Sequence, residues 1–292
     1  MVVSVEELDC LDALLWLDRG EFASLKLSVS QSTVSRASRR VAAEFGLELM
    51  KGQDEWLLLG DCSYLNLERQ LHQRFRWDRQ GQLRIDGQYY TGPLFAESLG
   101  KGFLLGNFDL LDVRKPIALL KSGIIDAWIA GYPDVPAPDD PDLVCFDLTR
   151  FPLRLVVSPR HPLVSAGDAV TLDDVAAYPC IALPDGAFPQ SQQILEAMGL
   201  WNTPARVRRF QYEKWLGMTS DQVSVGYASV FSIDLFPEPM VFLPIDLNFE
   251  VGETLVVKRE FADHPRFREL LGLRQSCVAQ LSQRYPEVSL AF

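Results

Sequence analysis

The stretch ASLKLSVSQSTVSRASRRVAAEFGLEL, residues 23–49, predicts two short helices joined by a tight turn. The first helix ends at Leu27, and residues 28–30 form the connection. Ser30 is a favourable N-cap for the second helix, which extends from Gln31 to about Phe45. Two helices joined in this way form helix-turn-helix geometry when the second presents a polar, basic face.

The second helix has such a face. Apolar side chains repeat on one side of it, and the other side carries Ser32, Ser35, Arg36, Arg39 and Arg40. Gln and Arg can form paired hydrogen bonds with base edges, and Ser or Thr hydroxyls can bind phosphate or base. Periodicity alone leaves a second interpretation open, in which this is the solvated basic face of an ordinary helix.

Upstream and downstream segments extend this pattern. Residues 5–18 show the spacing of an amphipathic helix, and Gly20 follows as a stop signal. Residues 61–76 place Leu65, Leu67, Leu71 and Phe75 among charged residues, which predicts a further helix. That helix either packs on its own domain or pairs with a second subunit, because its heptads are too few to decide.

Charge and length set limits on the whole chain. The protein has 292 residues, of which 48% are hydrophobic, so two domains are expected. Its net charge of −11 argues against nucleic acid as a partner, because phosphate contacts require cations. Between Phe22 and Phe45, however, Lys26 and three arginines outweigh Glu44. This segment is therefore positively charged, although the chain as a whole is negatively charged.

Several functional classes lack support in the sequence. No run of about 18 apolar residues occurs, and the early acidic residues do not suit a secretory signal, so a cytoplasmic protein without membrane contact is expected. The five cysteines and three histidines are scattered, which indicates neither a disulfide framework nor a metal site. No nucleophile elbow, P-loop or metalloprotease motif is present, so neither an enzyme nor a cofactor is expected.

From residue 82 onward, short apolar strands alternate with helical patterns, which favours β-α-β units and parallel strands. Expected strands include residues 82–86, 108–113, 124–130 and 206–210. Expected helices include residues 91–100 and 114–123 and a final helix from about His264 to Arg284. The paired acids Asp173-Asp174 suit a helix start better than a catalytic dyad.

Residues 23–49 resemble the helix-turn-helix of LysR-type transcriptional regulators. The positions in register with that family are Ala23, Leu27, Ser30, Gln31, Val34, Ser35, Gly46 and Leu49. The pieces LRI at 83–85, LLKSGIIDAWIAG at 119–131 and LRLVVSPRHPLVSAGDAVTLDDVAAYPCIALP at 153–184 resemble the effector domain of the same family. The resemblance covers nearly the whole chain.

The resemblance implies a fold and a division of the chain. It implies an all-α winged helix-turn-helix domain followed by an α/β two-lobed domain like the type 2 periplasmic binding proteins. The expected divisions are 1–60 for the DNA-binding domain, 61–80 for a linker helix and 81–292 for the effector-binding domain. Within the last, lobe I would cover about 81–149 and 262–292, and lobe II about 150–261. Homodimers or homotetramers are also implied.

The resemblance also implies two sets of site residues. The wing would span about Lys51 to Leu59, with Trp56 beneath it, and the expected DNA contacts are Gln31, Ser32, Thr33, Ser35, Arg36, Arg39, Arg40 and Lys51. A small, anionic metabolite would bind between the lobes, because helix N-termini there favour anions. The expected effector contacts are Gln88, Tyr89, Tyr90, Thr91, Tyr132 and Gly186.

The function expected from these features is transcriptional regulation. A small effector would favour one arrangement of the lobes and so alter binding to double-stranded DNA. An alternative is a cytoplasmic small-molecule sensor whose helix-turn-helix no longer binds DNA. The acidic net charge and Gly52, at a place where the family commonly has a wing arginine, favour that alternative, whereas Arg36, Arg39 and Arg40 oppose it.

Overall fold

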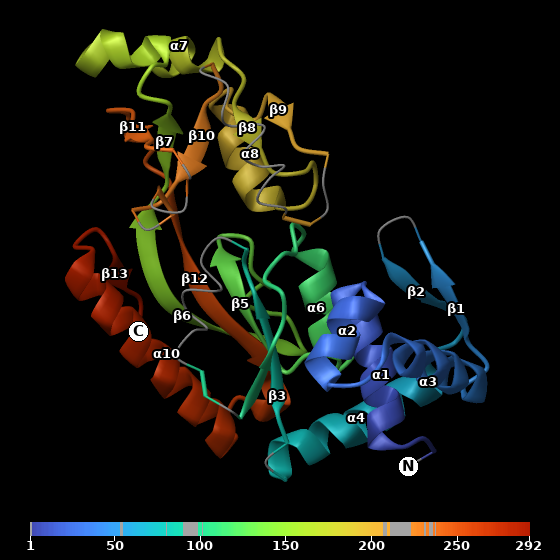
Figure 1. The fold of residues 1–292 in the computed structure, drawn as a ribbon. Coiled ribbons are helices and arrows are strands. Elements are labelled where there is room, and N and C mark those ends of the chain that lie inside the picture. The colour runs from blue at the N-terminus through green and yellow to red at the C-terminus, as the bar shows by residue number, and fades with distance from the viewer. Residues whose placement is uncertain are drawn as a thin grey trace.

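A computed structural model gives the positions of residues 2–52, 55–79, 81–89, 99–100, 102–206, 209–210, 223–230, 232–233, 236 and 238–292. Three parts are visible in Figure 1: an N-terminal helical unit with a small hairpin, a large sheet flanked by helices, and a smaller upper part. We call the large sheet with α6 and α10 the first lobe, and the upper part with α7 and α8 the second lobe.

The N-terminal unit contains three helices and one hairpin. The helices are α1 (Val5–Leu17), α2 (Gly20–Leu27) and α3 (Gln31–Glu44). Strands β1 (Glu48–Lys51) and β2 (Trp56–Leu59) pair in antiparallel fashion. The predicted N-cap is confirmed, because the Ser30 hydroxyl accepts a hydrogen bond from the Thr33 amide at 3.1 Å.

The turn between α1 and α2 differs from the prediction. Gly20 does not stop the first helix but begins α2. The left-handed C-cap of α1 is Asp18, with φ of 57°. Asp is one of the few non-glycine residues that tolerate this conformation. Its side chain is fixed there by contacts that the local sequence does not reveal, including the amide of Trp56 at 3.1 Å.

Helix α4 (Ser63–Asp78) buries its charged side and exposes its apolar side. Leu65 is buried, but Tyr64, Leu67, Leu71 and Phe75 are between 51% and 74% exposed. The buried face instead carries Glu68, Arg69, His72, Gln73, Arg76 and Trp77. The prediction of a helix is confirmed. The side that packs on its own chain is the polar one.

The first lobe is built on a six-stranded sheet with the order β13-β6-β12-β5-β3-β4. Strand β3 is parallel to β4 and β5, as the alternating pattern predicts, whereas β12 is antiparallel to β5 and β6. The strands are β3 (Leu83–Gly87), β4 (Phe103–Leu105), β5 (Ala127–Tyr132), β6 (Leu143–Pro152), β12 (Glu250–Lys258) and β13 (Ser289–Leu290). Helix α10 (Pro265–Arg284) covers one side and α6 (Arg114–Lys121) the other.

The second lobe holds two smaller sheets. One has the order β10-β7-β11, and the other pairs β8 with β9 in parallel. The strands are β7 (Arg154–Val157), β8 (Ile181–Ala182), β9 (Thr203–Pro204), β10 (Gly226–Ala228) and β11 (Val241–Phe242). The helices are η1 (Pro162–Ala169), α7 (Leu172–Ala176) and α8 (Pro189–Ala197), while η3 (Arg259–Phe261) follows β12. Asp174 belongs to a capping box with Thr171, so the Asp pair does begin a helix.

The expected strand at 108–113 is not formed, and the expected strand at 206–210 lies partly outside the described residues. The run at 108–113 forms a loop in which only Leu110 makes a bridge, and its partner is Arg209 from the expected strand at 206–210. Phe108 has φ of 51°, which turns the chain away from strand geometry at the start of this run. The expected helix at 91–100 falls largely on residues outside the described ones.

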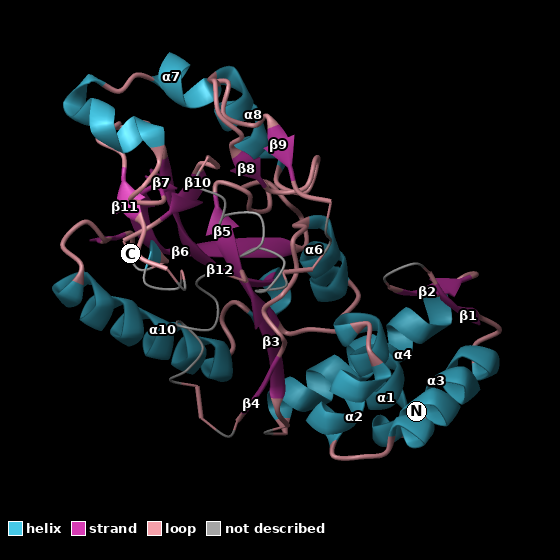
Figure 2. Cartoon of the chain, turned by 45° about the horizontal axis from the view of Figure 1, so that its top comes forward, coloured by secondary structure: helices cyan, strands magenta, loops and turns pink. Residues whose placement is uncertain are grey.

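The N-terminal unit packs directly on the first lobe. Helices α1 to α4 gather on the side of the sheet opposite α10 (Figures 1 and 2). Apolar side chains of α1 and α3 belong to the same buried cluster as Leu111, Leu120 and Trp128 of the first lobe. The Trp16 indole also donates a hydrogen bond of 2.6 Å to the buried carboxylate of Asp86 on β3. The two parts therefore share one core.

Buried ion pairs cross this shared core. The Asp12 carboxylate accepts hydrogen bonds from Arg69 of α4 at 2.8 Å and from Arg84 of β3 at 3.2 Å. Asp126 accepts from both Arg76 nitrogens at 3.0 and 3.1 Å. Both aspartates are fully buried. Buried charges persist only where they are paired and hydrogen-bonded, so these pairs fix α4 between α1 and the sheet.

Removing Asp126 should therefore destabilise the protein strongly. We expect Asp126→Ala to lower the free energy of unfolding by about 3–5 kcal/mol, because the buried charge of Arg76 would lose its carboxylate and keep only the Gly123 carbonyl. The control is Glu287→Ala, which breaks an exposed ion pair with Arg154 and should cost less than about 1 kcal/mol. Urea titrations followed by circular dichroism measure both. Equal losses of unfolding free energy in the two variants would show that the buried Asp126 pair contributes no more to stability than the exposed one.

Candidate functional site

Helix α3 presents two parallel rows of polar side chains. Gln31, Ser35 and Arg39 are spaced four residues apart and form one row. Ser32, Arg36 and Arg40 form the row beside it, and all three are exposed. The opposite side of α3 buries Val34, Ala37 and Val41 against the rest of the N-terminal unit. The apolar side therefore holds the helix in place and leaves both polar rows accessible.

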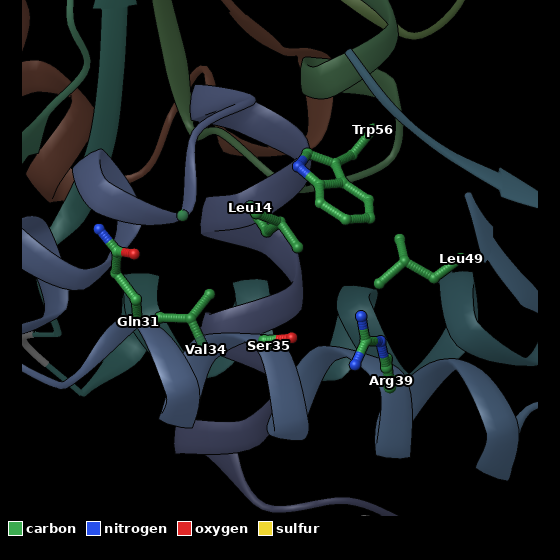
Figure 3. Close-up of a pocket in the computed structure, with 8 residues that line it drawn as sticks. Leu14, Gln31, Val34, Ser35, Arg39, Leu49 and Trp56 are labelled. Atoms are coloured by element: carbon green, nitrogen blue, oxygen red, sulfur yellow. The ribbon is translucent and has the colours of Figure 1, made fainter. Parts of the chain in front are cut away.

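A hollow of about 140 Å³ lies between α3 and the hairpin (Figure 3). Its polar edge is the first row, Gln31, Ser35 and Arg39, which extend from one side of α3. Its other lining residues are Leu14, Gly20, Val34, Leu49 and Trp56. The hollow thus combines an apolar floor with a rim that bears hydrogen-bond donors and one cation.

Hydrogen bonds at the start of α3 fix its first hydroxyls. The Ser30 hydroxyl lies 2.8 Å from those of both Ser32 and Thr33. Arg36 folds back along the helix, and its Nε donates to the Ser32 carbonyl at 3.2 Å. The Arg36 side chain nevertheless lies on the exposed surface. Arg36 is therefore oriented by α3 itself and remains accessible.

Two of the expected DNA contacts already have partners in the chain. Arg40 forms an ion pair with Glu7 at the start of α1, although its side chain stays largely exposed. Lys51 is exposed at the end of β1, and its ammonium lies 6.0 Å from the centre of the Trp56 ring. Both positive charges are therefore held close to the N-terminal unit. Arg36 and Arg39 have no such ion pair among the described residues.

Sequence reasoning missed the contribution of Gly20 to this surface. Gly20 is the first residue of α2, whose amide groups carry the partial positive charge of a helix N-terminus. It lines the hollow beside Gln31 and Ser35. The exposed Arg19 precedes it. The signal was available, because a glycine before Glu21 can begin a helix as readily as end one.

Of the expected effector contacts, Gln88 is buried and Tyr89 is partly buried. Gln88 follows β3 and is buried, and its side-chain oxygen has no hydrogen-bond partner among the described residues. Tyr89 stacks on Phe210, with ring centres 4.6 Å apart, and burial raises the pKa of its hydroxyl. The predicted contacts Tyr90 and Thr91 lie outside the described residues.

The other two expected effector contacts lie apart. Tyr132 ends β5, and the Arg150 guanidinium lies 3.8 Å from its ring centre in a cation–π contact. Gly186 is exposed in the loop before α8, and its amide donates to the Gln192 side chain at 2.7 Å. Tyr132 therefore contacts β6, one of the two strands that connect the lobes. Gly186 belongs to the second lobe alone.

The helix N-terminus expected to attract an anion already has a carboxylate. Asp134 follows β5 in the first lobe and accepts hydrogen bonds from the amides of Gln190 and Ser191 at 2.8 and 3.1 Å. These are the first amides of α8 in the second lobe. Asp134 therefore connects the two lobes and satisfies donors that an anionic ligand would otherwise use.

Glu253 is a further polar residue that the sequence did not single out. It lies on β12 between β5 and β6, opposite Gly131 and Thr149. The side chain is fully buried, and neither carboxylate oxygen has a hydrogen-bond partner among the described residues. Burial raises the pKa of Glu253 well above its ordinary value. Such groups are rare in folded proteins and occur at functional sites.

Other classes of site find no support in the described part of the chain. No group of three or more His, Cys, Asp and Glu side chains there could hold a metal ion. All five cysteines are free thiols. Of the helices that the structure describes, none combines the length and the apolar character that crossing a membrane requires.

The family model for the LysR substrate-binding domain matches residues 107–277. The chain belongs to the LysR family. Members of this family are transcriptional regulators with an effector-binding domain. The resemblance seen at 119–131 and 153–184 is thereby confirmed. No curated protein matches the chain in sequence.

Solved structures of LysR-type regulators share the fold of this chain. It is similar to a probable transcriptional regulator from Pseudomonas aeruginosa, with 16% identity, a TM-score of 0.58 and coverage of 94% of this chain and 97% of that one. Full-length OxyR from Pseudomonas aeruginosa gives 17% identity, a TM-score of 0.56 and 94% coverage of each chain. Full-length CbnR in complex with its target DNA gives 18% identity, a TM-score of 0.52 and coverage of 95% of this chain and 99% of that one. The two-part LysR fold is common to all of them.

The buried Glu253 of this LysR-family chain should reduce stability at neutral pH. Its raised pKa means that the folded protein holds a proton that the unfolded chain has released. Stability is therefore lost as pH rises above the ordinary glutamate pKa. Glu253→Gln should unfold at a higher temperature than the parent at pH 7, because the glutamine does not have to stay protonated to remain buried.

The pH dependence of this difference provides the control. Near pH 4 and below, Glu253 is neutral in both the folded and unfolded states, so parent and variant should approach the same melting temperature. Calorimetry or circular dichroism between pH 4 and pH 8 would follow the difference. A constant gap across this range would contradict the assignment of the effect to ionisation of Glu253.

Proposed function

We propose that this LysR-family chain is a transcriptional regulator that binds double-stranded DNA, and that a small effector between the lobes changes this binding. The observation that carries the proposal is the double row of polar side chains on α3, one row of which lines the hollow beside the hairpin. A helix with such a face fits the major groove, and its first residues lie nearest the bases. CbnR, which is similar to this chain in overall fold, was solved in complex with its target DNA.

The two rows suggest different contacts with DNA. Gln31, Ser32 and Arg36 lie in the first half of α3, where a recognition helix reads base edges. Arg39 and Arg40 lie further along the helix, where phosphate contacts are favoured. The hollow beside α3, with Gly20 at the N-terminus of α2, suits a backbone phosphate, because helix N-termini and basic side chains both favour anions.

The effector would lie where the two crossing strands β6 and β12 join the lobes. Tyr132, Arg150 and Glu253 all lie on strands of this region. Arg150 pairs with Asp147 at 2.8 Å, and an anionic effector would compete with that carboxylate for the guanidinium. An anion at the N-terminus of α8 would have to replace Asp134 as the acceptor of the Gln190 and Ser191 amides. Because Asp134 connects the lobes, a metabolite that replaced it there would also break this contact between them.

Self-association is part of the proposal. The exposed row Tyr64, Leu67, Leu71 and Phe75 follows one side of α4 at helical spacing, and large exposed apolar patches mark interaction surfaces. A second copy of the same helix is a fitting partner, because a homodimer presents two recognition helices to two half-sites. We also propose the division at 1–60, 61–80 and 81–292, and action in the cytoplasm.

Substitution of Arg36 should distinguish base contact from general charge. We expect Arg36→Ala to cost about 1–3 kcal/mol of operator affinity and to relax the preference at one base position. Arg40→Ala is the matched control, because Arg40 already pairs with Glu7. It should weaken all sequences alike and lower the salt dependence by about one unit of slope at most.

The measurement is a binding titration at several salt concentrations, against genomic fragments that the parent protein retains. If the parent retains no fragment near physiological ionic strength, DNA binding is refuted. The chain would then be a small-molecule sensor with an inactive helix-turn-helix. The net charge of −11 gives that outcome a physical basis.

The exposed row on α4 predicts how assembly responds to charge. Leu71→Glu should shift the protein from a dimer or tetramer to a monomer of 32.9 kDa, because two carboxylates would meet at the paired helices. Val164→Glu, at an exposed apolar residue of the second lobe, is the control and should leave assembly unchanged. Light scattering at micromolar concentration measures both. A monomeric parent protein would end the proposal of a dimer.

A further inference from the structure

Asp18 connects three parts of the molecule through one carboxylate. It caps α1, and its side chain is 3% exposed. One oxygen accepts a hydrogen bond from the Trp56 amide of the hairpin at 3.1 Å. The other oxygen pairs with Lys115 of α6 in the first lobe and with Arg209 of the segment after β9. A single buried group thus joins the hairpin to cations that belong to the lobes.

Arg209 extends this connection into the first lobe and toward Tyr89. Its guanidinium also pairs with Asp109 of the first lobe and donates to the Trp16 carbonyl at 3.2 Å. Its neighbour Phe210 donates its amide to the Asp109 carbonyl at 2.7 Å and stacks on Tyr89. Tyr89 is one of the expected effector contacts. Arg209 therefore lies between that region and Asp18.

The strength of the Trp56 contact depends on these cations. Hydrogen bonds to an ionised carboxylate are stronger than those to a neutral acceptor. A nearly buried carboxylate keeps its charge and its place only while it is paired. Loss of Arg209 would leave Asp18 with Lys115 alone, in a left-handed conformation that favours few residue types. The hairpin would then lose part of what fixes it beside α3.

We propose that Asp18 is a positioning residue through which the lobes set the position of the hairpin relative to α3. Displacement of the Arg209 side chain would weaken the Asp18–Trp56 contact and alter the hollow that Trp56 and Arg39 share. The signal would pass within one chain, through an ion pair, without a change in the partner subunit. Its effect on DNA binding rests on the proposed function, but the coupling itself does not.

Hydrogen exchange on the full-length protein tests the coupling without DNA or effector. In Arg209→Met, we expect the amide exchange rate of residues 55–59 to rise about 3- to 10-fold, because the hydrogen bond from the Trp56 amide to Asp18 would be weakened. Exchange in the middle of α3 should change less than twofold. The matched control is Arg206→Met, because Arg206 is exposed, has the same charge and lies three residues away.

Two further variants keep the test informative if Arg209→Met fails to fold. Arg209→Lys keeps the charge but replaces the two nitrogens that reach Asp109 and Asp18 with a single one on a shorter side chain, so an intermediate rise is expected. Lys115→Met removes the other cation on Asp18 and should also accelerate exchange in residues 56–59, whereas Glu55 is left out of this comparison because it pairs with Lys115 directly at 3.7 Å. Exchange in that segment that matches the parent in all folded variants, with Arg206→Met as reference, would overturn the proposal.

A DNA arm separates this proposal from the proposed function. Arg209→Met should change affinity for the retained fragments at least fivefold, whereas Arg206→Met should change it less than twofold. If the parent binds no DNA and Arg209→Met still accelerates exchange in the hairpin, the coupling stands and the proposed function fails. If the parent binds DNA and Arg209→Met alters neither exchange nor affinity, the coupling fails and the proposed function stands.

Discussion

The burial of Asp12 is the constraint on which the arrangement of this chain depends. A carboxylate with no exposed surface requires cations, and the cations come from α4 and β3, which follow it by more than fifty residues in the sequence. Satisfying one charge therefore places α1, α4 and the edge of the large sheet against each other. Trp16 and Asp86 add a second buried contact between the same elements.

This constraint explains the unusual orientation of α4. A helix ordinarily buries its apolar side, but here Arg69, Gln73 and Arg76 must face inward to reach Asp12 and Asp126. Tyr64, Leu67, Leu71 and Phe75 are consequently turned outward. The polar contacts that hold one chain together thus leave an apolar surface for another. In the proposed dimer, stability within the subunit and association between subunits would use opposite sides of one helix.

Local signals in the sequence predicted local structure well. Ser30 and the apolar spacing of Val34, Ala37 and Val41 define α3, because capping and periodicity act within a few residues. The hollow could not be predicted, since Leu14, Gly20 and Trp56 approach α3 only in the folded unit. The strand expected at 108–113 was wrong for a related reason. Asp109 and Arg209 meet as an ion pair between distant segments, which no periodicity encodes.

The shared core also limits which N-terminal units could replace the one in this chain. Exchange of residues 1–60 for those of another regulator would leave Arg69 and Arg84 buried without Asp9 and Asp12. Uncompensated buried charges cost several kcal/mol each, enough to unfold many domains. Recombination at this boundary would therefore succeed only between chains that carry matching charges on both sides. A chimeric regulator that carries the N-terminal helices of this protein would also need arginines at the positions of Arg69 and Arg84.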